Sequence, residues 1–101
     1  MIFSLTMFPV GDGASLHEPV AEVVEMLDRA DLHYQVNASD TVIEGDWDSV
    51  LPAIRAAEER LRAKHRRVFM LLSVDDYAGA ENRLHGAVEE VERELHHAVR
   101  H

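Results

Sequence analysis

A chain of 101 residues with a formal net charge of −9 excludes several classes of protein before any motif is considered. Its 19 acidic side chains outnumber its 10 basic ones and repel phosphate backbones and anionic lipid surfaces, so we expect neither a nucleic acid nor a membrane as a partner. The absence of cysteine excludes disulfides and thiolate metal sites, and a hydrophobic content of 47% is too high for a disordered chain.

The chain length predicts a single domain over residues 1–101, with one hydrophobic core. The longest apolar stretch, residues 68–74, is far shorter than the roughly 20 residues that cross a bilayer. The N-terminus lacks the basic flank and the small-residue cleavage site of a signal peptide. These features predict a cytoplasmic protein.

The first half of the chain predicts a strand, a helix and a hairpin. Residues 2–10 are apolar, rich in strand formers and followed by a Gly-Asp-Gly turn. Ser15 and Glu18 form a capping box for a helix whose apolar residues recur at helical spacing. Residues 32–37 and 41–45 are two short strand-like runs separated by three turn residues, which indicates a hairpin.

The second half predicts a helix, a fourth strand and a third helix. Asp46 or Asp48 can cap the second helix, and Pro52 is expected in its first turn or so, where proline is tolerated. Residues 68–74 read as a buried strand, and the apolar spacing over residues 84–99 predicts a third amphipathic helix. A basic cluster near the end of the second helix is expected to complement the helix dipole; it comprises Arg60, Arg62, Lys64, Arg66 and Arg67.

This order predicts an α/β (α+β) fold, the ferredoxin-like βαββαβ plait, with two helices on one face of an antiparallel sheet and an added C-terminal helix. A sheet covered on one face should alternate apolar and polar residues, but the first strand places Phe3 and Leu5 on one face and Ile2 and Phe8 on the other. The second face therefore needs the third helix or another subunit to cover it. We favour another subunit, which predicts a homo-oligomer.

Residues 41–48, Thr-Val-Ile-Glu-Gly-Asp-Trp-Asp, resemble a hallmark of the small thiamine-binding, YkoF-like family, in which a Thr-x-x-Glu-Gly strand leads into the second helix. Four further features fall where that family places similar residues, so that the resemblance covers nearly the whole chain: Pro9-Val10-Gly11, the helix start at Ser15, Leu32-His33-Tyr34, and Asp75-Asp76. The resemblance implies a domain that pairs its sheets into dimers and often tetramers. It also implies binding of thiamine or its hydroxymethylpyrimidine fragment, with no catalysed reaction and no further cofactor.

The chain carries polar groups that suit such a ligand. An aminopyrimidine has ring nitrogens that accept hydrogen bonds and an exocyclic amine that donates them, so a carboxylate and several hydroxyls form a matching set. We expect the Glu44 carboxylate to take the amine or a ring N–H, Thr41 and Thr6 to orient the ring edge, and an aromatic ring to stack on it. The full set of predicted ligand residues is Glu44, Thr41, Thr6, Ser4, Tyr34 and Phe8.

The chain also departs from the family pattern. The family commonly carries an acid at the position of Ser4, a glycine at that of Asp40 and a lysine near Ser73, with basic residues where this chain has Tyr77 and Ala78. The loss of an acid and a lysine could mean one lost ion pair or a different ligand preference. The sequence leaves both alternatives open.

Several of these residues also have a purely structural interpretation. Glu44 could end a strand at the surface, and Trp47 more often closes a core edge or an interface than stacks on a ligand. His97 and His101 have the spacing of metal ligands on a helix, but the helix ends there and no carboxylate partner is evident, so we expect no metal. Residues 75–76 read as the end of a strand and not as a catalytic acid pair.

Two other functions compete with ligand binding. One is a ligand-free oligomeric module that docks another protein through its acidic surface and third helix. The other is a small enzyme on the same plait, because a fold alone does not fix a function. The sequence shows no activated nucleophile, no pair of catalytic acid–base residues and no cofactor-binding loop that would support an enzyme. We therefore predict a non-enzymatic protein.

Overall fold

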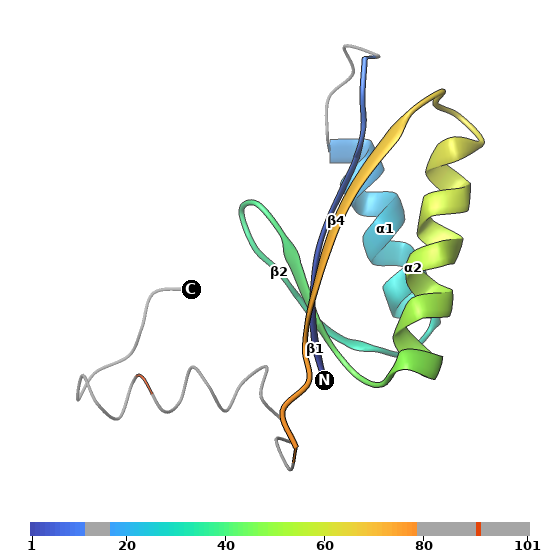
Figure 1. Ribbon diagram of the computed structural model, residues 1–101. Coiled ribbons are helices and arrows are strands. Elements are labelled where there is room, and N and C mark those ends of the chain that lie inside the picture. The colour runs from blue at the N-terminus through green and yellow to red at the C-terminus, as the bar shows by residue number, and fades with distance from the viewer. Residues whose placement is uncertain (12–16, 79–90, 92–101) are drawn as a thin grey trace.

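The computed structural model describes residues 1–11, 17–78 and 91 of the chain (Figure 1). The elements follow one another as β1 (Ile2–Pro9), α1 (His17–Arg29), β2 (His33–Val36), β3 (Thr41–Glu44), α2 (Trp47–Arg62) and β4 (Val68–Asp75). The strands form one antiparallel sheet in the order β2-β3-β1-β4, and both helices lie on the same side of it (Figure 1). The predicted βαββαβ plait is confirmed, whereas the predicted third helix and Ser15 of the capping box lie outside the described residues.

The second helix begins as the sequence predicts, but its proline lies further in. The side chain of Asp46 accepts a hydrogen bond from the Ser49 backbone N–H at 2.8 Å, so Asp46 and not Asp48 is the N-cap. Hydrogen bonds from Ser49 lower the pKa of the Asp46 carboxyl below its ordinary value. Pro52 lies inside the helix, in its second turn, so the expectation of a first-turn proline is wrong. Pro52 is exposed to solvent, so the packing of the core does not explain a proline at this position.

Strand β1 alternates strictly between the two faces of the sheet. Phe3, Leu5 and Met7 are buried against the helices, while the residues between them are half-buried. The core also takes five residues from α2 and one from β3, namely Val50, Ala53, Ile54, Ala57, Leu61 and Ile43. Burial of these side chains, at about 25 cal/mol per Å² of apolar surface, is the main source of stability in this layer.

The face of the sheet away from the helices, here called the open face, is only partly covered. Residues that pair across neighbouring antiparallel strands share a face, so the register places on it Ile2, Ser4, Thr6, Phe8, Val42, Glu44, Phe69, Leu71, Ser73 and Asp75. Phe8 packs on Phe69 with ring centroids 5.3 Å apart. Phe69 and Leu71 on the edge strand β4 nevertheless remain 42% and 62% exposed. Apolar and polar residues therefore share this face, and the exposed apolar ones include Phe69 and Leu71 on β4.

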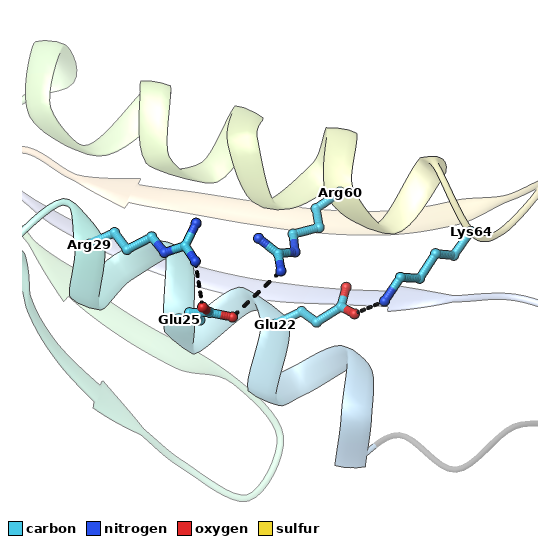
Figure 2. A network of polar contacts seen from close by, with 5 residues as sticks. All are labelled: Glu22, Glu25, Arg29, Arg60 and Lys64. Carbon is cyan, nitrogen blue, oxygen red and sulfur yellow. Dashed lines mark hydrogen bonds and ion pairs between the residues drawn. The ribbon is translucent and has the colours of Figure 1, made fainter.

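The basic cluster does more than complement the helix dipole. Glu25 of α1 accepts from Arg29 at 2.7 Å and lies 3.8 Å from Arg60 of α2, and Lys64 beyond the end of α2 pairs with Glu22 (Figure 2). The bond to Glu22 raises the pKa of Lys64. The second carboxylate oxygen of Glu22 is buried and has no hydrogen-bond partner within the described part of the chain. Two residues of the cluster, Arg60 and Lys64, thus form ion pairs with α1, while the Arg29 pair lies within α1.

Tyr34 ties β2 to the first helix. Its hydroxyl donates a 2.5 Å hydrogen bond to Oδ1 of Asp28, and its ring packs against the core on the helix side of the sheet. The bond to this carboxylate raises the pKa of Tyr34 above its ordinary value of 10.0. Because the neutral hydroxyl is the donor, its stabilising contribution is complete below that ordinary value and is lost as pH rises through the higher pKa of the folded protein.

We expect Asp28→Asn to move the pKa of Tyr34 down toward 10, because the charge and the strong acceptor that hold the proton are both removed. The ultraviolet absorbance of the phenolate measures this titration, in a Tyr77→Phe background that leaves Tyr34 as the single tyrosine. Asp31→Asn is the matched control, because Asp31 has a left-handed backbone (φ 55°) that asparagine tolerates. Equal Tyr34 titrations in the two variants would show that Asp28 does not hold the proton.

Gly45 allows the end of β3 to approach α2 closely. A Cβ atom built there would lie 2.7 Å from Cγ2 of Val50, which is fully buried. We expect Gly45→Ala to lower the free energy of unfolding by about 1–2 kcal/mol, because overpacking outweighs the lower entropy of the unfolded chain. Urea denaturation measures the change.

Val50→Ala supplies the control for this prediction, because it removes the atom that the new Cβ would meet. In that background Gly45→Ala should cost less than about 0.5 kcal/mol. The same cost in both backgrounds would rule out the contact with Val50 as its cause.

Candidate functional site

A difference in strand length creates the main candidate site. β1 pairs with β4 along all eight of its residues, but it pairs with the four-residue β3 only over Ile2–Leu5. Within the described residues, the second half of β1 therefore has a strand on one side and none on the other. A cavity of about 340 Å³ lies beside it, lined by residues 5–8 of β1, Val20 and Val23 of α1 and residues 36–41 of the hairpin.

Hydrogen bonds hold the hairpin turn against β1 at this cavity. The Asn37 backbone N–H donates to the Asp40 carbonyl at 2.8 Å, and the Asn37 amide donates to Oδ1 of Asp40 at 3.0 Å. Ser4 donates to Oδ2 of Asp40 at 2.6 Å, and Thr6 donates to the Ser39 carbonyl at 3.1 Å. The turn is thus fixed both internally and to the central strand, so the wall of the cavity is preformed.

The cavity contains three of the six residues predicted to bind a ligand. Thr6, Phe8 and Thr41 line it directly, and Ser4 contacts its lining through the hydrogen bond to Asp40. The lining is mainly apolar, with hydroxyls, a carboxylate and an aromatic ring among the apolar side chains. This combination of an apolar enclosure with a few placed polar groups is typical of small-molecule sites, and the volume lies in their usual range of roughly 300–1,000 Å³.

Glu44 and Tyr34 lie elsewhere. Thr41 pairs with Leu5 and faces the helices, while Glu44 pairs with Ile2 and lies on the open face. The two residues are three positions apart in one strand, which places them on opposite faces and about 10 Å apart at roughly 3.4 Å per residue. Tyr34 is on the helix side and bonded to Asp28. The structure therefore does not bring the predicted set together around one point.

Asp40 is the residue of this site that the sequence analysis did not select. It was noted only as a departure from the family pattern, whereas Ser4 was also a predicted ligand residue, and the structure joins the two by a hydrogen bond. The register between β1 and β3 could have revealed it, because continuing that register by one residue places position 40 opposite Thr6, on the face of Ser4. A turn residue has no periodicity of its own, so the hydrophobic pattern gave no such signal.

Trp47 has the structural role that the sequence suggested. Its ring meets Phe3 edge to face, with centroids 5.5 Å apart and planes at 84°. It remains 48% exposed and lines a wider apolar groove of about 760 Å³ between α2 and the edge strand β4. This groove is larger than the first cavity but lacks its set of bonded polar groups at one end, so we take the smaller cavity as the candidate site.

Two kinds of feature were sought in the described parts of the chain and not found. No group of three histidine or carboxylate side chains in residues 1–11, 17–78 and 91 is arranged to hold a metal ion. None of the described helices combines the length and the apolar character needed to cross a bilayer.

Comparisons with known proteins agree with the fold and with the resemblance seen in the sequence. The UPF0045 protein MJ1052 of Methanocaldococcus jannaschii is 32% identical over 82 residues, which are 81% of this chain and 82% of that protein. A UPF0045 protein of Methanothermobacter thermautotrophicus is 34% identical over 94 residues, covering 90% of this chain and 95% of that protein. Both matches therefore extend over most of the relative's own length.

Solved structures show the same architecture. The crystal structure of MJ1052 superposes with a TM-score of 0.81 at 29% identity and covers 89% of this chain and 93% of that one. A Thermotoga maritima protein provisionally assigned to thiamine biosynthesis or salvage superposes with a TM-score of 0.76 at 21% identity, covering 89% and 96%. The family model described as "Thiamine-binding protein" matches residues 3–92. The chain therefore belongs to the thiamine-binding protein family.

Proposed function

We propose that this protein binds thiamine or its hydroxymethylpyrimidine fragment without catalysing a reaction. The observation that carries the proposal is the cavity beside the half of β1 that does not pair with β3, where hydroxyls and a carboxylate meet an apolar enclosure of about 340 Å³. Membership of the thiamine-binding protein family supports this ligand class. The Thermotoga maritima neighbour supports a connection to thiamine at the level of the fold.

The groups around the cavity suit the edge of an aminopyrimidine. The hydroxyl of Thr41 can accept from its amine or donate to a ring nitrogen, and that of Thr6, which donates to the Ser39 carbonyl, can still accept from the amine. Ser4 holds the carboxylate of Asp40 in place. The ring of Phe8 offers a surface for stacking. Tyr34 acts indirectly in this arrangement, by fixing β2 and so the hairpin that forms one wall.

Glu44 takes part only if the ligand reaches the end of the open face near Ile2. From its position opposite Ile2 it cannot contact, within one chain, a small ligand enclosed near Thr41. The predicted role of Glu44 and the predicted role of Thr41 therefore describe two alternative positions of the ligand, which substitutions can separate.

We expect calorimetric titration with thiamine and, separately, with hydroxymethylpyrimidine to show saturable binding to the unmodified protein. Thr41→Val keeps the shape of the side chain and removes its hydroxyl, so it should weaken binding about 2- to 10-fold with little change in the urea midpoint. Glu44→Ala should leave binding intact if the ligand occupies the cavity.

The opposite outcomes are equally informative. Binding lost in Glu44→Ala and kept in Thr41→Val would move the ligand to the open face. No heat and no thermal stabilisation with either compound would overturn the thiamine proposal and favour the ligand-free interaction module.

We also propose that the open face is where another copy of the chain packs, giving a dimer or a tetramer. Phe69 and Leu71 are exposed there next to the half-buried Phe8 of β1, and an exposed group of large apolar side chains is a common mark of a surface that another protein chain covers. Such a contact between identical open faces would be isologous, as in most homodimers.

Leu71→Glu should shift the oligomer toward monomer, because it places an unpaired charge in the proposed interface. Light scattering coupled to size-exclusion chromatography measures the mass. Leu51→Glu, the same change on the α2 side of the groove, is the control and should leave the mass unchanged. Dissociation by Leu51→Glu alone would place the interface in the groove, and a monomeric unmodified protein would end the proposal.

A further inference from the structure

Asp40 lines the cavity, and hydrogen bonds fix its carboxylate there. It is half-buried at the last position of the hairpin turn, and it contributes to the cavity lining. Each of its oxygens already accepts one hydrogen bond, Oδ2 from Ser4 and Oδ1 from Asn37. Because the two donors come from different elements, β1 and the turn itself, they fix the plane of the carboxylate and not only its position.

This carboxylate can accept further hydrogen bonds. An ionised carboxylate has about four lone-pair sites, and the two bonds to Ser4 and Asn37 use two of them. Within the described residues no lysine, arginine or histidine side chain forms an ion pair with Asp40. Its charge is therefore held beside a largely apolar cavity without a cationic partner from this part of the chain, and a bound donor would compensate it.

The neighbouring groups indicate which kind of ligand could supply that donor. Thr41 and Thr6 add hydroxyls, and Phe8 adds an aromatic ring, so the site favours a flat ring with N–H groups on one edge. A ring carbonyl at the same edge would place two acceptors against each other. The site thus discriminates by a mismatch of hydrogen-bonding groups, which is the strong form of selectivity, and not by size alone.

We propose that Asp40 is the specificity-determining residue of this cavity and selects planar amino-substituted heterocycles over their oxo analogues. The inference rests on the proposed function, since it names the group that recognises the edge of the ligand ring by hydrogen bonding. Ser4 and Asn37 are positioning residues that act through Asp40 and do not themselves touch the ligand.

The test compares hydroxymethylpyrimidine with its oxo analogue, in which a carbonyl replaces the amino group, by calorimetric titration. The unmodified protein should prefer the amino compound. Asp40→Asn should weaken binding of the amino compound on the order of 10- to 100-fold and change that of the oxo compound far less, so that the preference collapses. Ser4→Ala should weaken the amino compound by a smaller factor.

Matched variants keep the result interpretable. Asp76→Asn removes the same charge from an exposed residue outside the cavity and should leave both affinities unchanged. Asp40→Ser, a smaller uncharged residue suited to a turn, replaces Asp40→Asn if urea denaturation shows that the latter is unfolded.

The outcomes separate the two proposals. Binding of the amino compound with an undiminished preference in a folded Asp40 variant would overturn the role of Asp40 and leave the proposed function standing. An equal loss of affinity for the amino compound in Asp76→Asn would attribute the effect to the net charge of the protein, and it would also overturn the role of Asp40. No binding of either pyrimidine or of thiamine by the unmodified protein would overturn both.

Discussion

The arrangement of this domain depends on the unequal lengths of its strands. The two long strands β1 and β4 pair over eight residues, whereas the hairpin β2–β3 pairs with β1 over only four. The hairpin turn therefore falls beside the middle of the central strand instead of at its end. This one mismatch leaves the second half of β1 without a neighbour on one side among the described residues, and it brings the polar residues of the turn to that place.

The strand order has a second effect, at the other edge of the sheet. β4 is as long as the central strand but lies at the edge, so among the described residues its full length is paired on one side only. Exposed edges are usually short or carry charges, because they can pair with other chains. Here the edge strand is apolar from Val68 to Leu72 and leaves Phe69, Met70 and Leu71 exposed. The short hairpin on one side of β1 thus leaves a cavity, and the long apolar edge strand on its other side presents a surface suited to association.

Much of the fold could be predicted from the sequence, because its periodicities are strong. The sequence patterns gave the order of all six described elements, and they limited the N-cap of α2 to Asp46 or Asp48, of which the structure shows Asp46. The site was harder for two physical reasons. The predicted set joined Thr41 to Glu44, although a strand separates residues three apart onto opposite faces. Asp40 was missed because a turn residue reaches its partners through tertiary contacts, here Ser4 at a separation of 36 positions.

The motif that carried the family resemblance has a mainly structural explanation. Gly45 leaves room for Val50, Asp46 caps the helix, and Trp47 closes the core edge against Phe3. These requirements concern the passage from β3 into α2, some distance along β3 from the cavity. The motif is therefore strong evidence for the fold, while the evidence for a ligand comes from the other end of the strand.

The carboxylate of Asp40 near that end of the strand belongs to a chain that is acidic as a whole. A formal net charge of −9 produces a negative potential that concentrates small cations near the surface and repels anions. Thiamine carries a positive charge on its thiazolium ring, so the general field favours its approach, although a field of this kind does not distinguish one cation from another.

Selection has to come from groups at contact distance, where the medium is less polar and a fixed carboxylate interacts more strongly than in water. The turn that holds Asp40 supplies such a group, and Ser4 and Asn37 fix its direction before any ligand arrives. Because this order is established by folding, little conformational entropy remains to be lost on binding, which is the physical advantage of building the site on a bonded turn.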